Sequence, residues 1–277
     1  MIDNISVGNQ ILLLRKRNGF TQEELAEKLG ISAQAISKWE NGHTLPETAL
    51  LPVLAKLLNC SIDSILMPIV TKEGDIISFG KFQWRVLQVN DNSALVITET
   101  TIGKAPYHDG HTDITWEDCN LRKYLNGEFY NKFTDSEKSR IIKTKLTDHD
   151  NPWYGTACGS STFDKVFLLS FDEILKYFGD SGDVRNKKGW YWGEHDKITP
   201  CDESCYMKYG DCVYDEFNDA RKAQNANGSD DWWWLRSPGG QGMHTAGSIG
   251  YKGELFLCGD DVYRVDGGVR PALWLSL

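Results

Sequence analysis

The sequence lacks an apolar run long enough to cross a bilayer, and its amino terminus lacks a basic segment followed by an apolar core. These absences argue against membrane insertion and against secretion. Hydrophobic residues make up 40% and charged residues 25% of the 277 residues, as in an ordinary soluble globular protein. We therefore expect a cytoplasmic protein without a membrane partner, and its length suits two domains.

Short motifs of the common enzyme classes are also missing. The chain has no Gly-x-Ser-x-Gly, no phosphate-binding glycine loop that ends in Lys-Ser/Thr, and no His-Glu-x-x-His. The run from Gly239 to Gly242 has irregular spacing and favours a flexible loop over a dinucleotide site. We therefore predict no catalytic residue and no cofactor.

The seven cysteines are odd in number and irregular in spacing, so they do not form a disulfide framework, and we expect free thiols. Metal-capable side chains occur in the loop His108–Asp113 and at Cys201, Cys205 and Cys212 near His195. Neither place has the paired C-x-x-C spacing of a structural zinc site, and loosely spaced donors are common by chance. The sequence predicts no metal site.

The stretch 21–42 predicts two short helices joined by a tight turn. Thr21 and Glu24 have the spacing of a capping box, Gly30 supplies the positive φ of the turn, and Ser32 caps the second helix. That helix turns a small polar face outward: Ala33, Gln34, Ser37 and Lys38. A short polar-faced helix held at a fixed angle by its predecessor suits the width of the DNA major groove.

This stretch resembles the helix-turn-helix of the phage-repressor family (Cro/CI-like or XRE-like), and the resemblance covers roughly residues 7–66. It implies an all-α, five-helix DNA-binding domain over residues 1–68. Two residues match phosphate-holding positions of the family: Gln22 and Asn41. Five match recognition-helix positions that face base edges or nearby phosphates: Ser32, Ala33, Gln34, Ser37 and Lys38.

The side-chain chemistry agrees with these roles, because a Gln amide can pair with adenine and a Lys can donate to guanine. The alternative is a helical bundle that has lost DNA binding or binds protein. Beyond the central pair, we expect a first helix from Ser6 to Gly19, a fourth with Pro46 in its first turn, and a last one that Pro68 ends. A short connector at 69–75 follows.

The distribution of net charge indicates which part of the chain could bind DNA. The chain carries −9 in total, and residues 1–68 account for only −1, with six Lys/Arg and seven Asp/Glu. The strongly acidic remainder would not bind DNA through a broad basic surface. We therefore expect modest affinity from each small first domain, and a homodimer on two half-sites of double-stranded DNA.

From Ile76 the pattern changes to that of a second domain, residues 76–277. Residue composition predicts strands at 76–79, 82–89, 94–100, 166–169, 232–235, 254–256, 262–265 and 272–277. Capping signals predict helices at 115–126, after Thr134 and after Ser170. Residues 179–231, rich in Gly, Asp and Asn, predict a long irregular region. The whole is an α+β domain.

Five blocks of this domain resemble an uncharacterised bacterial domain over residues 75–277. They are WRVL at 84–87, WEDCNLRKYLN at 116–126, DKVFLLS at 164–170, WWLRSP at 233–238 and GVRPAL at 268–273. The last two blocks are similar to the C-type-lectin-like folds of formylglycine-generating enzymes and of retroelement-diversified phage receptor-binding proteins. That similarity implies a twisted antiparallel sheet with long loops. The cysteine arrangement of the enzymes has no match around Cys258.

Nine of the ten tryptophans follow residue 68. Aromatic faces that stack on a ligand, with arginines that clamp a carboxylate or phosphate, would form a pocket from Trp192, Trp233, Arg236 and Arg270. The alternative, which we favour, is an aromatic core whose arginines hold the closing loops. Because side chains alternate along a strand, Trp232, Trp233 and Trp234 cannot all face the same way.

The sequence thus predicts a DNA-binding transcriptional regulator whose second domain senses an unknown small-molecule or protein effector, or dimerises. Two alternatives remain open. The second domain could be an enzyme that the helix-turn-helix localises, or the protein could be a lectin-like binding or display protein.

Overall fold

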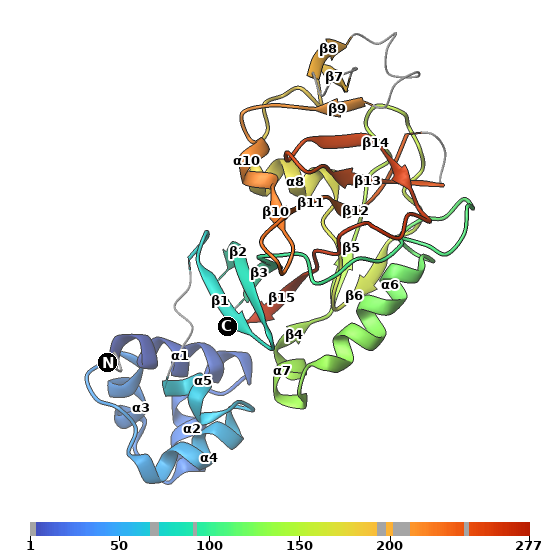
Figure 1. The fold of residues 1–277 in the computed structure, drawn as a ribbon. Helices are drawn as coiled ribbons and strands as arrows, with labels where there is room; N and C mark the ends of the chain where they lie inside the picture. Colours follow the sequence, from blue (N-terminus) through green and yellow to red (C-terminus); the bar gives the residue numbers. More distant parts are fainter. Residues whose placement is uncertain (1–3, 67–71, 91–92, 193–197, 202–210, 241–243) are drawn as a thin grey trace. The chain divides into compact units, whose positions relative to one another are not determined.

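The computed structural model describes residues 4–66, 72–90, 93–192, 198–201, 211–240 and 244–277, with the backbone alone at 190–192, 198–201 and 211 (Figure 1). The chain divides into two compact units, with the division between Thr71 and Lys72. That division falls inside the connector expected at 69–75. None of the described helices combines the length and the apolar character that a bilayer crossing requires.

Within its described part, the amino-terminal unit packs five α-helices around one apolar core, as the sequence predicts. The helices are α1 (Asn4–Arg17), α2 (Gln22–Leu29), α3 (Ala33–Glu40), α4 (Leu51–Leu57) and α5 (Ile62–Leu66), with a 3-10 turn η1 (Thr48–Leu50) before α4. The most buried core residues include Val7, Ile11, Leu25, Ile36, Leu54 and Ile65. The apolar faces of all five helices therefore share one interior.

The turn between α2 and α3 forms as its sequence signals predict. The Thr21 hydroxyl accepts from the Glu24 amide (3.1 Å), and the Glu24 carboxylate accepts from the Thr21 amide (2.7 Å). Gly30 turns the chain at a φ of 69°, and the Ser32 hydroxyl accepts from the Ala35 amide. These bonds satisfy amides that the helix ends would otherwise leave unpaired, and they set the angle between the two helices.

Other helix boundaries differ from the prediction. Helix α1 begins at Asn4 and ends at Arg17, two residues earlier at each end than expected. Pro46 precedes the turn η1 instead of occupying a first helical turn, and Pro52 has that position in α4. Proline is preferred in the first turn of a helix, and both Pro46 and Pro52 could occupy that position. The sequence pattern alone therefore did not show which of the two begins the fourth helix.

The carboxy-terminal unit contains two antiparallel sheets, so the α+β prediction is confirmed. The five-stranded sheet has the order β1-β2-β3-β15-β4, and the six-stranded sheet has the order β12-β13-β14-β9-β7-β8. The first sheet comprises β1 (Ile76–Phe79), β2 (Phe82–Asn90), β3 (Ser93–Thr98), β4 (Ile141–Ile142) and β15 (Ala272–Ser276). The second comprises β7 (Gly189–Trp192), β8 (Ile198–Cys201), β9 (Asp211–Val213), β12 (Trp233–Pro238), β13 (Thr245–Ile249) and β14 (Leu255–Asp261).

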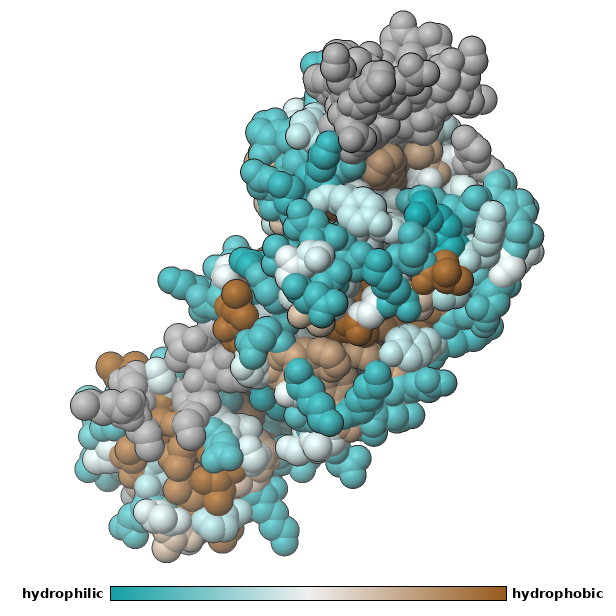
Figure 2. Space-filling model, viewed as in Figure 1, coloured by the Kyte–Doolittle hydropathy of each residue, from teal (hydrophilic) through white to brown (hydrophobic). Residues whose placement is uncertain are grey.

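Two short strand pairs and several helices complete the unit. The pairs are β5 (Thr144–Leu146) with β6 (Thr162–Asp164) and β10 (Ala223–Gln224) with β11 (Asp230–Asp231). The helices are α6 (Asn120–Tyr124), a π-turn η2 (Leu125–Phe129), a 3-10 turn η3 (Tyr130–Lys132), α7 (Asp135–Arg140), α8 (Phe171–Phe178) and α10 (Asn218–Arg221). On the face in Figure 2, hydrophilic residues cover most of this unit and hydrophobic ones form small groups.

The carboxyl-terminal segment joins parts of the unit that are far apart in sequence. Strand β15, red in Figure 1, lies between β3 and β4, with Leu275 opposite both Ala94 and Ile141. Just before it, the Gly268 amide donates to the Trp232 carbonyl (2.9 Å) and the Val269 amide to the Gly103 carbonyl (2.9 Å). One continuous segment therefore connects the strand β12 of one sheet with an interior strand position of the other.

Strands at 76–79, 82–89, 94–100 and 272–277 are confirmed within one or two residues. Those at 232–235 and 254–256 overlap β12 and β14, and helices form after Thr134 and Ser170, but some other predictions for this unit are wrong. The predicted helix 115–126 begins only at Asn120 and continues past Gly127 as a π-turn. Residues 166–169 form a single bridge at Phe167, and 262–265 form a turn. Short apolar runs have no periodicity that separates a strand from other buried backbone. The region 179–231, predicted to be irregular, contains five described strands and α10, and β13 was not predicted.

Gly268 provides a test of the closing segment. A Cβ at this position would lie 2.4 Å from the Trp232 carbonyl oxygen and 2.8 Å from Thr101 Cγ2. We expect Gly268→Ala to destabilise the unit by about 1–3 kcal/mol, as overpacking does, measured by urea unfolding with tryptophan fluorescence. Gly127→Ala, with no atom within 4 Å of the added Cβ, is the matched control. Equal stability of the two variants would contradict the importance of this contact.

Candidate functional site

A buried ion pair holds the outward-facing helix α3 in the amino-terminal unit. The Arg15 guanidinium donates to both Glu40 carboxylate oxygens (Nε 2.5 Å, Nη2 2.9 Å), and Nη1 donates to the Phe20 carbonyl. The Gln22 side-chain amide also donates to Glu40 (2.6 Å). The Glu40 side-chain hydrogen bond is the main reason that the pKa of Arg15 is raised. Helices α1, α2 and α3 therefore meet at one carboxylate.

The face of α3 offers the polar side chains that the sequence assigns to it. Ser32, Gln34 and Lys38 are exposed, and Ser37 is half-buried. Ala33 differs from its outward placement, because it is half-buried and packs against the core. Packing of Ala33 brings the first turn of α3 close to the body of the unit, while Gln34 and Lys38 project from it.

Both residues expected to hold phosphates also take part in contacts inside the unit. The Asn41 side-chain amide donates to the Ser37 carbonyl (2.8 Å), at the carboxyl end of α3. Gln22 lies in the first turn of α2, and its side-chain amide is engaged by Glu40. The contact between Gln22 and Glu40 was not visible in the sequence, because the two residues are 18 positions apart.

The three consecutive tryptophans of the carboxy-terminal unit are core residues. Trp232 is 3% exposed and Trp233 and Trp234 are fully buried. The Trp232 and Trp234 rings contact each other edge to face at 4.7 Å, while the Trp233 indole donates to the Arg221 carbonyl elsewhere. The alternation expected from strand geometry is therefore observed. Trp192 lies on β7, and its side chain is outside the described residues.

Arg236 is fully engaged inside the protein. Its Nε donates to Asp148 (2.8 Å), Nη1 donates to the Leu168 carbonyl (2.6 Å), and Nη1 also contacts the Glu173 carboxylate (2.5 Å). Burial acts to lower the pKa of Arg236, but the two carboxylates outweigh burial and raise it. This arginine thus holds loops together, as the favoured alternative predicts.

Arg270 has a different environment and lines a pocket of about 610 Å³. Its side chain is buried, and among the described residues it donates only to the carbonyls of Thr98 (2.9 Å) and Glu99 (3.4 Å). Its Nη1 has no hydrogen-bond partner among the described residues, and the guanidinium lies over the Trp233 ring (5.0 Å) and the Phe178 ring (5.7 Å). Burial lowers the pKa of Arg270 to about 10.

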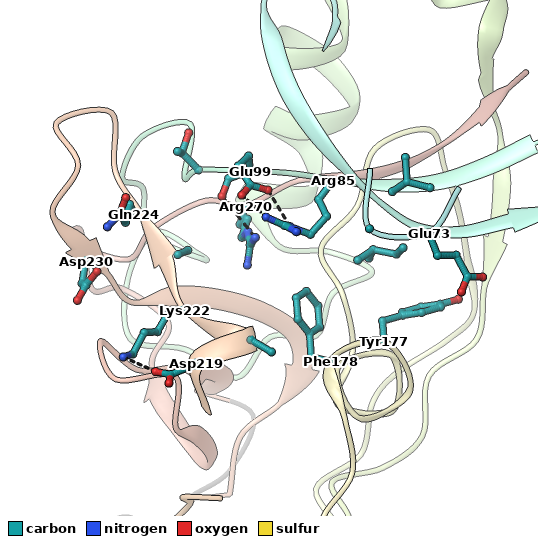
Figure 3. Close-up of a pocket in the computed structure, with 16 residues that line it drawn as sticks. Glu73, Arg85, Glu99, Tyr177, Phe178, Asp219, Lys222, Gln224, Asp230 and Arg270 are labelled. Atoms are coloured by element: carbon teal, nitrogen blue, oxygen red, sulfur yellow. Dashed lines mark hydrogen bonds and ion pairs between the residues drawn. The ribbon is translucent and has the colours of Figure 1, made fainter. Parts of the chain in front are cut away.

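Four of the other charged side chains around this pocket form two ion pairs, and the carboxylates of Glu73 and Asp230 also line it. Figure 3 shows the ion pairs Arg85–Glu99 and Lys222–Asp219 on two sides of Arg270. Of the four residues predicted to form a ligand pocket, Arg270 lines it and Trp233 and Arg236 do not, while the side chain of Trp192 is outside the described residues. No sequence signal marks Arg85 or Lys222 as pocket residues, because they are far from Arg270 along the chain and come together only in the fold.

The two groups of metal-capable side chains noted in the sequence differ in what the structure shows of them. His111, from the loop 108–113, lies beside two residues that sequence reasoning missed, His244 and Asp261, with their donor atoms within 4.8 Å of one another. Of the cysteine group, Cys212 is buried, whereas His195, Cys205 and the Cys201 side chain lie outside the described residues.

Each of the two units matches a known protein-family model. Residues 91–277 match the family model described as "Domain of unknown function (DUF6273)", and residues 11–65 match a helix-turn-helix model. The chain belongs to the DUF6273 family. The predicted helix-turn-helix domain is confirmed, and so is the assignment of the second domain to an uncharacterised family. The matches give no support to a lectin-like fold or to one like the formylglycine-generating enzymes.

Named relatives of this DUF6273 protein match its amino-terminal unit. The competence pilus inhibition repressor of Acinetobacter baylyi is 40% identical over 63 residues, which are 23% of this chain and 57% of the relative. The uncharacterised helix-turn-helix-type transcriptional regulator YazB of Bacillus subtilis is 39% identical over 61 residues, 22% of this chain and 88% of the relative. The chain thus spans little more than half the length of the first relative.

Among solved structures, the P22 c2 repressor in complex with a synthetic operator is 38% identical. The alignment covers 22% of this chain and 92% of that one, with a TM-score of 0.22. The sequence identities, together with the helix-turn-helix model, establish the amino-terminal unit as a domain of the XRE-type regulator family.

Removal of the Glu40 carboxylate tests the three-helix junction. Glu40→Ala would leave the Arg15 charge buried without its partner, which costs about 3–5 kcal/mol. We expect it to abolish most of the stability of the amino-terminal unit, measured by hydrogen exchange of the α3 amides. Glu47→Ala, which removes an exposed carboxylate, is the control. Unchanged exchange in Glu40→Ala would refute the role of the pair.

Proposed function

We propose that this protein is a sequence-specific DNA-binding transcriptional regulator that acts as a homodimer. The exposed polar face of α3, fixed at its angle by the capped turn and by Glu40, carries this proposal. Gln34, Ser37 and Lys38 enter the major groove, and Ser32 and Ala33 approach its edge. Relatives named as repressors and regulators, and one solved with an operator, support the assignment.

Phosphate contacts orient the unit on the duplex in this proposal. Gln22 lies in the first turn of α2, where unpaired backbone amides and the helix dipole favour an anion. Asn41 follows α3 and reaches a phosphate on its other side. Such contacts give register without sequence information. The near-neutral charge of residues 1–68 makes two copies on two half-sites necessary for tight binding.

Substitution of Lys38 separates base reading from phosphate contact. If Lys38 donates to a base, Lys38→Ala weakens the selected site by about 1–3 kcal/mol and relaxes the preference at one position. The measurement is competition binding of the full chain at several salt concentrations. Lys56→Ala removes the same charge from α4 and serves as the control.

The two variants must differ for the base-reading assignment to hold. A loss for Lys38→Ala that is uniform across DNA sequences, with a shallower salt dependence, would instead assign Lys38 to a phosphate. Normal binding of the selected site by the double variant Gln34→Ala, Lys38→Ala would eliminate α3 as the reading surface.

The effector of this regulator, in our proposal, is a small organic anion that binds in the Arg270 pocket. A carboxylate or phosphate would supply the partner that the buried guanidinium lacks among the described residues. The Phe178 and Tyr177 rings give the same pocket an apolar side. Control of transcription then requires that the effector bind the DNA-competent and incompetent states with different affinity.

A pocket-filling variant tests the effector site. Ala220 lines the pocket and is exposed, so Ala220→Phe blocks the space without disturbing the core. We expect pools of small carboxylates or of phosphates to raise the melting temperature of the wild type and not that of Ala220→Phe. Ala226→Phe, an exposed alanine outside the lining, is the control. An equal rise in both variants would place the anion elsewhere.

A further inference from the structure

Three segments of the DUF6273 unit bring two histidines and a carboxylate to one place. His111 lies in the loop 108–113, His244 directly precedes β13, and Asp261 ends β14. One potential donor atom from each residue lies within 4.8 Å of the other two. The cluster shares no residue with the lining of the Arg270 pocket.

Backbone hydrogen bonds fix the arrangement of these segments. In the β13–β14 ladder Thr245 is opposite Asp261, and the Val262 amide donates to the His244 carbonyl (3.0 Å). The His108 amide donates to the Val262 carbonyl (2.9 Å), which attaches the loop to the same edge. The three side chains therefore meet because their backbones are bonded, not because three mobile groups happen to be close.

The side chains of His111, His244 and Asp261 lie close together but make no hydrogen bond with one another. The His111 and His244 rings lie 4.6 Å apart between centroids, and His111 Nε2 is 4.0 Å from Asp261 Oδ1, too far for a hydrogen bond. Asp113 adds a second carboxylate, with Oδ1 3.6 Å from His244 Nδ1. With neutral imidazoles, the group carries two negative charges. Arg264, in the same turn as Asp261, is engaged by Asp260 and Asp266.

We propose that His111, His244 and Asp261 bind a divalent first-row transition-metal ion such as Zn²⁺, Co²⁺ or Ni²⁺. Two imidazoles with a carboxylate match the preferences of these ions, whereas Mg²⁺ and Ca²⁺ prefer oxygen donors alone. Asp113 is a positioning residue: once its carboxylate moves closer than the present 3.6 Å, it accepts a hydrogen bond from Nδ1–H of His244 and leaves Nε2 to the metal. Water completes the coordination, because the site is at the surface.

The required movements are small. Bonds of about 2.0–2.1 Å to a tetrahedral ion place its donors about 3.4 Å apart. The present separations of up to 4.8 Å therefore need a contraction of roughly 1–1.5 Å. His111 and Asp261 are 60% and 42% exposed and His244 is 28% exposed, so side-chain rotation can supply it. Metal binding would then attach the loop 108–113 to the sheet through side chains as well as through its backbone.

The test is titration of the full chain, stripped of metal by a chelator that is then removed, with Zn²⁺ and with Co²⁺. We expect one ion per chain from this site and a Co²⁺ absorption spectrum with nitrogen and oxygen ligands, free of a thiolate charge-transfer band. The double variant His111→Ala, His244→Ala should lose at least about tenfold in affinity. Asp113→Asn should weaken binding by a smaller factor.

His149→Ala is the matched control, because His149 is an exposed histidine 2.6 Å from a carboxylate, Asp172, outside this cluster. It should bind Zn²⁺ as the wild type does. Equal urea unfolding of the metal-free wild type and variants would show that the fold is intact. Unchanged Zn²⁺ affinity in the double variant, no binding by the wild type, or a thiolate band from its only Co²⁺ site would each overturn the proposal.

Discussion

The fold of the DUF6273 unit depends on the closing segment from Gly267 to Ser276. Its backbone is bonded on one side to residues 102–105 and on the other to Trp232 and Trp234, and it then enters the five-stranded sheet as β15. Because buried backbone groups must be paired, this segment can occupy its place only when both neighbours are present. It also carries Arg270 into the pocket, so the fold and the candidate effector site share one constraint.

In the amino-terminal unit Glu40 has a comparable role on a smaller scale. One carboxylate receives Arg15 from α1 and Gln22 from α2, and it sits at the last residue of α3. The helix that faces outward is thus held by a buried charge pair as well as by apolar packing. This arrangement suits a unit with only six Lys/Arg in residues 1–68, because DNA recognition as we propose it rests on a few well-positioned polar side chains and not on a broad positive surface.

Short-range sequence signals correctly predicted the helix caps and the turn that depend on neighbouring residues. The capping boxes at Thr21, Thr134 and Ser170 and the turn at Gly30 all form, because each depends on residues three or four positions apart. The predicted α3 face is in place apart from the half-buried Ala33. Neither success required knowledge of distant contacts.

What the sequence could not supply depends on pairing across long separations. Nothing near Arg236 indicates that Asp148 and Glu173 will neutralise it, or that Arg270 will have only carbonyls. His244 and Asp261 come together through the β13–β14 ladder and the loop of His111 through the His108–Val262 backbone bond, and β13 was not predicted. Four-residue apolar runs such as 166–169 were misassigned because burial, not strand pairing, explains their composition.

Recovery of DNA by the full-length protein from a random-sequence pool tests the central claim most directly. Repeated selection followed by sequencing should enrich one motif of two related half-sites in inverted orientation, separated by about one helical turn, as a dimer with two α3 helices requires. A pool that stays random after selection, although the protein is folded, would contradict sequence-specific recognition by this helix-turn-helix.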